Sequence, residues 1–83
     1  HPAVSEGRLN RLGYDLLGAD PAAAVAVFEL NTEFYPTSAN SFDSLGEGLL
    51  KLGDRERAAA SYRRSLELNP GNSNARRILA ELE

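Results

Sequence analysis

The side chains in this sequence that could do chemistry are one histidine, several serines and a few acidic pairs. His1 is the only histidine and precedes a proline at the terminus, so we interpret it as a tag remnant and not as a metal ligand. No serine lies in a nucleophile elbow, because the glycines at 46 and 48 surround a glutamate. The sequence therefore predicts no catalytic triad and no enzyme.

Acidic pairs one helical turn apart could in principle share a metal ion. Two such pairs are Glu29 with Glu33 and Asp43 with Glu47. Pairs at this spacing are ordinary on a solvated helix face, so we expect no metal and no cofactor. The arginines interleave with acidic residues and the net charge is −3. We therefore expect surface ion pairs and no nucleic-acid binding.

Composition is that of one small globular domain. The 83 residues are 42% hydrophobic and 25% charged, so a single domain over residues 1–83 with a thin core is expected. No apolar run approaches the roughly 18 residues of a membrane span. The absence of cysteine excludes disulfides but leaves the compartment open, with the cytoplasm favoured over the periplasm. The chain begins His-Pro without a signal-peptide pattern, so we expect an excised fragment or a processed product.

The apolar pattern predicts an all-α chain of five helices, because no segment alternates with the period of a strand. Asp20 and Asp54 are expected N-caps, Asn72 or Ser73 caps the last helix, and Gly53 is an expected left-handed C-cap. The expected ranges are about 5–17, 20–35, 37 or 38 to 53, 54–69 and 72–83. The expected inward residues of the second, fourth and fifth helices are Ala24, Val27, Phe28 and Asn31; Ala58, Tyr62, Ser65 and Leu66; and Ala75, Ile78, Leu79 and Leu82.

The chain also repeats itself. An alanine, an aromatic residue and a proline recur 34 positions later: Ala24, Phe28 and Pro36 correspond to Ala58, Tyr62 and Pro70. The Leu-Gly pair at 12–13 recurs 33 positions later at 45–46, so the first unit lacks one residue, and a turn is the expected place. The units cover about 5–36 and 37–70, followed by a closing helix at about 72–83.

The second unit resembles a tetratricopeptide repeat (TPR). The matching positions are Phe42, Leu45, Gly46, Leu49, Gly53, Ala58, Tyr62, Ser65 and Pro70. The first unit departs from the family pattern at Arg8 and Asn31. The resemblance implies an α-solenoid of about two and a half helix-turn-helix units wound as a right-handed superhelix.

The resemblance assigns different roles to the two glycines of the third helix. It makes Gly46 and Ala58 the close-contact pair of the second unit, with alanine tolerated at Gly46 and larger residues not. It gives Gly48 no such role. Gly48→Ala is therefore expected to stabilise the helix by up to about 1 kcal/mol.

In the TPR family the concave groove, lined by the first helix of each pair, usually binds an extended peptide or a partner helix. Relatives that bind a terminal carboxylate carry Lys and Asn where this chain has Asp43 and Glu47, which favours an apolar or basic segment instead. Taken position by position, the resemblance implies that Asn10, Tyr14, Leu17, Asn40, Asp43, Glu47, Leu50, Lys51 and Arg77 bind the partner, with Gly7 and Asn74 beside them.

One end of the chain has surplus apolar residues. Leu9, Leu12, Leu16 and Leu17 have no preceding hairpin to cover them, so this end is expected to join another domain or a second copy. The run 28–75 is also similar to tails appended to bacterial enzymes such as serine hydrolases. Two functions therefore remain open: a non-catalytic protein-interaction module, or a structural or dimerisation appendage of a larger bacterial hydrolase or peptidase with catalysis outside this chain.

Overall fold

A computed structural model describes residues 4–83, so His1 lies outside the described part of the chain. The described residues form five α-helices: α1 (Glu6–Leu17), α2 (Pro21–Phe34), α3 (Ala39–Leu52), α4 (Arg55–Leu68) and α5 (Ser73–Leu82). The all-α prediction and the order of the five helices are confirmed.

Local capping explains where the helices begin and end. Each helix follows a side chain that accepts a hydrogen bond from the backbone N–H three residues on; these caps are Ser5, Asp20, Ser38, Asp54 and Asn72. Gly53 ends α3 with a φ of 91°, as expected of a left-handed glycine cap. Gly18 ends α1 with ordinary helical angles. Counted from the Leu-Gly pair, α1 ends two residues earlier than α3, whereas the linker 18–20 is one residue longer than the linker 53–54. The missing residue of the first unit is therefore lost from the end of α1, and the expectation that the turn itself is shorter is wrong.

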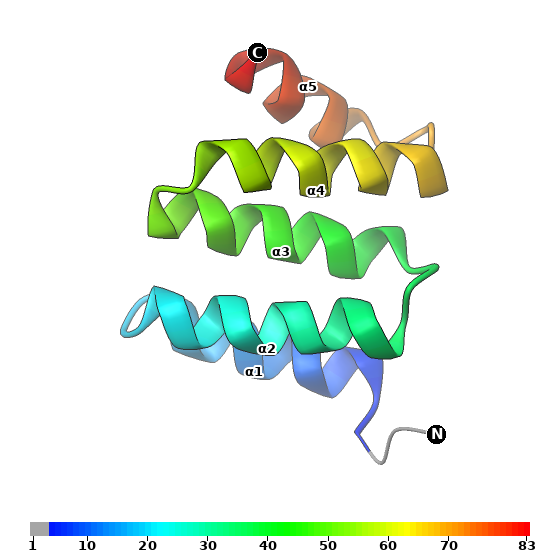
Figure 1. Ribbon diagram of the computed structural model, residues 1–83. Coiled ribbons are helices and arrows are strands. Elements are labelled where there is room, and N and C mark those ends of the chain that lie inside the picture. The colour runs from blue at the N-terminus through cyan, green and yellow to red at the C-terminus, as the bar shows by residue number, and fades with distance from the viewer. Residues whose placement is uncertain (1–3) are drawn as a thin grey trace.

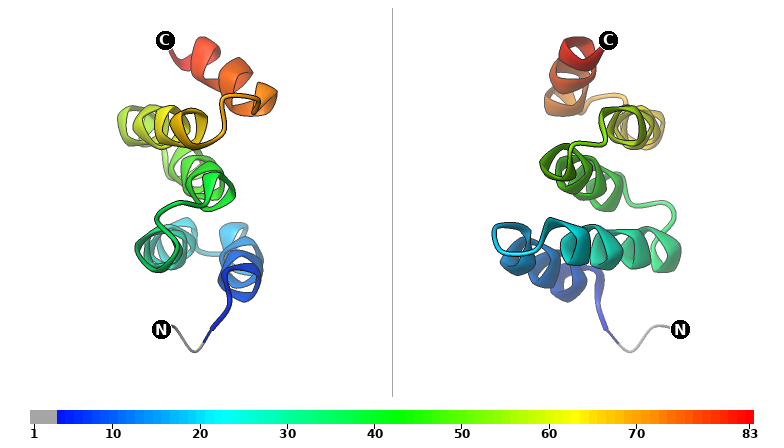
Figure 2. Two further views of the ribbon diagram at one scale, coloured as in Figure 1. Left: turned by 90° about the vertical axis from the view of Figure 1, so that its right-hand side faces the viewer. Right: turned by 60° about the vertical axis from the view of Figure 1, so that its left-hand side comes forward.

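Helices that are consecutive in the chain pack against one another, and α1 also contacts α3 (Figure 1). Figure 2 shows α1, α3 and α5 on one side of the molecule and α2 and α4 on the other. The molecule measures 35 × 27 × 15 Å along its principal axes. None of the helices in residues 4–83 has the length and hydrophobicity needed to cross a membrane.

Within each hairpin, a glycine on the first helix lies against an aromatic ring of the second helix. A Cβ atom added at Gly13 on α1 would lie 2.2 Å from Cε1 of Phe28 on α2. One added at Gly46 on α3 would lie 2.6 Å from Cε2 of Tyr62 on α4. The nearest atoms to Gly46 therefore belong to Tyr62 and not, as expected, to Ala58. Alanine at Gly46 would overlap this ring, so the expectation that Gly46 tolerates alanine is wrong as well.

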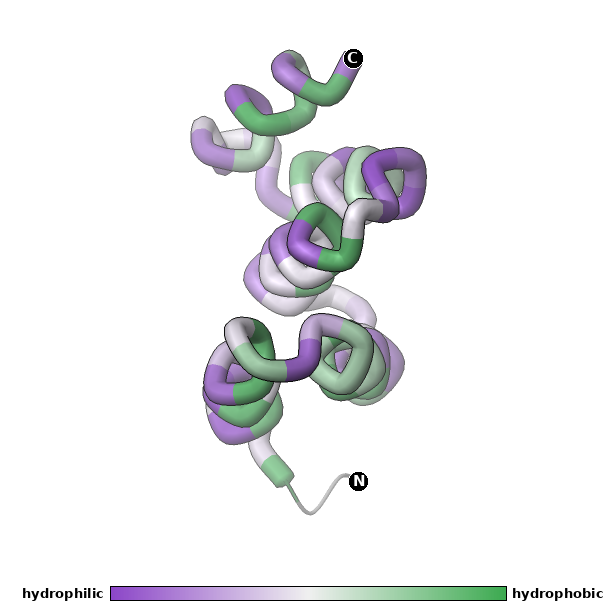
Figure 3. Tube along the Cα trace, turned by 90° about the vertical axis from the view of Figure 1, so that its left-hand side faces the viewer, coloured by the Kyte–Doolittle hydropathy of each residue, from purple (hydrophilic) through white to green (hydrophobic). Residues whose placement is uncertain are grey.

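The buried stripes are wider than the sequence pattern suggested. On α2, Ala24, Phe28 and Asn31 are buried as expected, but Val25 is buried and Val27 only half-buried. The reason is that α2 packs between α1 and α3 and must cover two neighbours. Likewise Ala59 and Ser61 of α4 are buried, whereas the expected core residues Leu66, Ile78, Leu79 and Leu82 are half-buried. Figure 3 shows that hydrophobic residues also occur throughout the first hairpin, at the end opposite α5.

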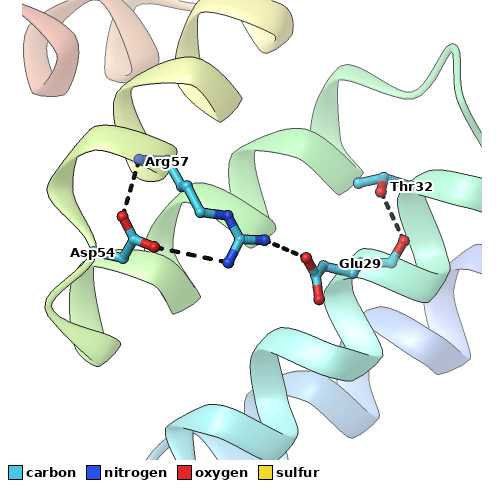
Figure 4. Close-up of polar contacts among 4 residues, drawn as sticks. All are labelled: Glu29, Thr32, Asp54 and Arg57. Atoms are coloured by element: carbon cyan, nitrogen blue, oxygen red, sulfur yellow. Dashed lines mark hydrogen bonds and ion pairs between the residues drawn. The ribbon is translucent and has the colours of Figure 1, made fainter.

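Several arginines make the ion pairs that the sequence suggested. The guanidinium of Arg57 on α4 pairs with Glu29 on α2 and lies 3.7 Å from Asp54, the cap of its own helix (Figure 4). Arg63 reaches Glu83 at 3.2 Å. These side chains are exposed or partly exposed, so each pair contributes little to stability.

Gly48 lies against α2, which changes the expectation for its substitution. A Cβ atom there would lie 2.9 Å from Cδ2 of Phe28 and 3.3 Å from Cγ2 of Val25. Phe28 is fully buried, so its ring has little room to move. We now expect Gly48→Ala to lower the free energy of unfolding by about 1 kcal/mol, because overpacking outweighs the gain in helix propensity.

Chemical denaturation measures this effect against a matched control. Gly7 has nothing within 4 Å of an added Cβ atom, so Gly7→Ala should be neutral or stabilising. If Gly48→Ala were as stabilising as Gly7→Ala, the close packing of α3 on α2 would be wrong.

Candidate partner-binding surface

The surface expected to bind a partner is formed by α1, α3 and α5, which lie on one side of the molecule (Figure 2). We call it the α1–α3–α5 face. All nine expected binding residues belong to these three helices. They differ in accessibility and in the contacts they make.

A hydrogen-bonded bridge between α1 and α3 forms the centre of this face. The Tyr14 hydroxyl donates to Oε1 of Glu47 at 2.8 Å and lies 3.3 Å from Oγ of Ser44. The Ser44 hydroxyl donates to Oδ1 of Asn10. The Tyr14 ring packs edge-on against Phe28, with ring centroids 5.2 Å apart. Each bond of the bridge joins one helix to the other, so the packing of α1 on α3 positions these side chains.

Two tyrosines on or beneath the face have a raised pKa. Burial raises the pKa of Tyr14, and the negative charge of Glu47 adds to the shift. Burial also raises the pKa of Tyr62, helped by the charges of Asp43 and Glu47. The charge of Arg77 opposes this shift in the pKa of Tyr62.

Asp43 is a charged group whose hydrogen bonding is incomplete. Its Oδ1 atom is buried and has no hydrogen-bond partner among the described residues. Burial raises the pKa of Asp43 and the charge of Glu47 adds to it, while the amides of Asn72 and Asn74 oppose the shift. A buried acceptor without a donor costs free energy, roughly 1 to 3 kcal/mol. The groups that act on this carboxylate as donors are thus the amides of Asn72 and Asn74, at the start of α5.

The other expected residues fall into two groups. Asn40, Lys51 and Arg77 are exposed, and Arg77 donates to Oδ1 of Asn74 at 2.8 Å. Leu50 is half-buried against the core. Leu17 is only 8% exposed and belongs to the core, so its expected place on the accessible surface is corrected. It follows the buried Leu9 and Gly13 at four-residue spacing, which puts it on the side of α1 that faces α2.

Sequence reasoning missed two residues of the face. Ser44 is 2% exposed and lies between Asn10 and Tyr14. Asn72 caps α5 and donates to Oγ of Ser65 at 3.1 Å, and its side chain also opposes the rise in the pKa of Asp43. The only available signal for Ser44 was a small polar residue beside Leu45. Its partners are 34 and 30 residues away, so the contact depends on how α1 and α3 pack.

Residues 4–83 enclose no pocket and hold no group of three or more His, Asp or Glu side chains placed to bind a metal ion. Comparison with models of known protein families gave no match, and comparison with curated protein sequences gave none either. The TPR resemblance therefore rests on the residues and contacts of this chain, and it stays a prediction.

Proposed function

We propose that this chain is a non-catalytic protein-interaction module of the TPR type, whose α1–α3–α5 face binds an extended apolar or basic protein segment. In this proposal the five helices make about two and a half units of a right-handed α-solenoid, and the face is its concave groove. The proposal concerns contacts with protein, and it involves no cofactor, nucleic acid or membrane.

Equivalent contacts in the two hairpins support the repeat. Gly13 meets the ring of Phe28 as Gly46 meets that of Tyr62. Asn31 donates its side-chain amide to the backbone carbonyl of Glu6 at 3.2 Å, and the Ser65 hydroxyl donates to that of Ala39 at 2.9 Å. In both comparisons the first-helix residues are 33 positions apart and the second-helix residues 34 apart. The offsets found in the sequence therefore recur in the tertiary contacts.

The observation that carries the proposed function is the set of acceptors beside Tyr14. Glu47 is exposed, the Asp43 carboxylate next to it is half-buried, and Tyr14 is 39% exposed. An extended segment offers backbone N–H groups, and basic side chains complement the two carboxylates. Apolar side chains of the same segment can pack on the tyrosine ring.

Charge reversal on this face tests the proposal. Fluorescence anisotropy would compare labelled peptides of alternating Lys and Leu with peptides of alternating Glu and Leu. We expect the Lys peptides to bind, and Glu47→Lys to weaken binding roughly ten-fold, because a close charge pair contributes about 1.5 kcal/mol. Glu33→Lys makes the same charge change at an exposed position on α2 and should leave binding unchanged.

Two results would count against the groove. Equal weakening by both variants would mean that only the net charge matters. Equal binding of the Lys and Glu peptides would mean that the acids play no part.

A second function, a structural or dimerisation appendage of a larger bacterial hydrolase or peptidase, is favoured by a different observation. The described residues have six exposed large hydrophobic side chains, and five of them lie on or just before the first hairpin: Val4, Leu12, Leu30 and Phe34, besides Tyr14 of the α1–α3–α5 face. Exposed apolar side chains that gather at one end are typical of an interaction surface. This function is independent of the groove.

A further inference from the structure

The first hairpin has an apolar surface on the side away from α3, which we call the terminal face. It comprises Leu12 and Leu16 of α1 and Val27, Leu30 and Phe34 of α2, and all five are half-buried or exposed. Figure 3 shows hydrophobic residues on both helices of this hairpin.

The contacts of α1 establish which way its leucines point. Asn10 and Tyr14 face α3, because they meet Ser44 and Glu47. Leu12 lies two residues from each of them, about 200° around the helix. Leu12 therefore points away from α3.

The contacts of α2 lead to the same conclusion for its outer residues. Val25 and Phe28 face α3, because both lie against Gly48. Leu30 and Phe34 lie about 140° and 180° around the helix from Val25. Their exposed fractions are 40% and 43%. Both helices thus contribute apolar side chains to the terminal face.

The chain itself shows how such a surface is normally covered. Leu12 and Leu16 precede Leu45 and Leu49 by 33 residues and occupy the same positions on α1 as these do on α3. Leu45 and Leu49 are 8% and 1% exposed and share a core cluster with residues of α2, whereas Leu12 is 47% exposed. The equivalent surface on α3 is therefore closed by a packed helix.

Charges on α1 indicate what covers the terminal face. Arg8 precedes Leu12 by four residues and Asp15 follows it by three, so opposite charges flank the leucine on the same side of the helix. Both are exposed, and neither takes part in an ion pair within residues 4–83. When two such helices meet antiparallel about Leu12, Arg8 of each lies opposite Asp15 of the other. The pattern is self-complementary, as a two-fold interface requires.

The second helix fits the same two-fold axis. Gly13 on α1 contacts Phe28 on α2, and the two helices are antiparallel, so Leu12 is level with position 29. Leu30 is one residue away, about 1.5 Å along the axis. Leu12 and Leu30 therefore lie side by side at the centre of the terminal face.

We propose that the terminal face is the two-fold interface of a homodimer, with α1 antiparallel to α1 of a second copy and Arg8 of each chain paired with Asp15 of the other. This proposal deepens the self-association function above and rests on it. Two helices about 10 Å wide and roughly 20 Å long present about 400 Å² of flat area per chain, at the small end of specific interfaces. We therefore expect dimerisation at roughly tens of micromolar.

Sedimentation equilibrium from about 5 to 500 µM chain, at low salt, tests the apolar part of the interface. The average mass of the wild type should rise from that of one chain toward that of two. Leu12→Glu should weaken dimerisation more than roughly ten-fold, because it buries a charge at the centre. The control is Leu52→Glu, which changes a leucine of similar exposure, 45%, at the end of α3 and should dimerise like the wild type.

Charge exchange tests the antiparallel pairing. Arg8→Glu and Asp15→Arg should each weaken dimerisation roughly ten-fold, because each puts like charges together twice per dimer. The double variant restores both pairs and should return to within about three-fold of the wild type. Circular dichroism of every variant checks that the helices remain folded.

The possible failures are distinguishable. A wild type that stays monomeric throughout would overturn both the interface and the self-association function. A dimer that persists in Leu12→Glu would overturn this interface and leave self-association at another surface. A double charge variant no better than the single ones would overturn the antiparallel arrangement.

Discussion

Gly13→Ala is expected to lower the free energy of unfolding by about 3 kcal/mol, a large part of the roughly 5 kcal/mol available to a small domain. An added Cβ atom would lie 2.2, 2.6 and 2.7 Å from three carbons of the Phe28 ring. Phe28 is fully buried and lies against Gly48 on its other side, so the ring cannot retreat. The methyl group therefore has to push α1 away from α2.

Denaturation in urea measures this loss, with Gly7→Ala as the control on the same helix. Gly7 has no atom within 4 Å of an added Cβ, so its substitution should raise stability by up to about 1 kcal/mol. The double variant, Gly13→Ala with Phe28→Leu, should lose less free energy of unfolding than the two single variants lose together, because the smaller side chain relieves the overlap. Wild-type stability in Gly13→Ala would show that α1 and α2 pack less closely than described.

Phe28→Ala is expected to cost about 4 kcal/mol and to leave the domain close to unfolded at room temperature. The Phe28 ring is 0% exposed and joins three helices: it lies on α2, meets Gly13 of α1 and meets Gly48 of α3. It also packs against the ring of Tyr14, with the two ring centroids 5.2 Å apart. Its loss leaves a cavity where the two hairpins meet.

Phe34→Ala is the matched control for this substitution. Phe34 is on the same helix but 43% exposed, so its loss should cost less than about 1 kcal/mol. Both variants should be measured near 5 µM, where the proposed terminal interface is mostly dissociated. Similar losses in the two variants would contradict the assignment of Phe28 as the central core residue.

The predicted binding surface was only partly readable from the sequence. The TPR resemblance implied nine binding residues, all of them on the first, third and fifth helices, which lie on one side of the molecule. Accessibility was not readable: Leu17 is in the core, and Ser44, which was not expected, lies between Asn10 and Tyr14. These outcomes depend on how closely α1 approaches α2 and α3.

The difference between Gly46 and Gly48 has the same origin. Both lie in the middle of α3, and the TPR resemblance implied a packing role for the first only. In the structure Gly46 lies under Tyr62 of α4 and Gly48 under Phe28 of α2. Because α3 packs between two helices, it needs a close approach on each side.

By itself, the sequence determined the five helices, their order and three of the five N-cap sites, at Asp20, Asp54 and Asn72 or Ser73. A cap acts on an N–H group three residues away, and helical periodicity acts within one or two turns, so both can be read locally. Only the tertiary structure decided that Val25 is buried, that Gly48 is in contact with Phe28 and that Tyr14 reaches Glu47. These contacts join residues on different helices, and helix packing fixes which side chains meet.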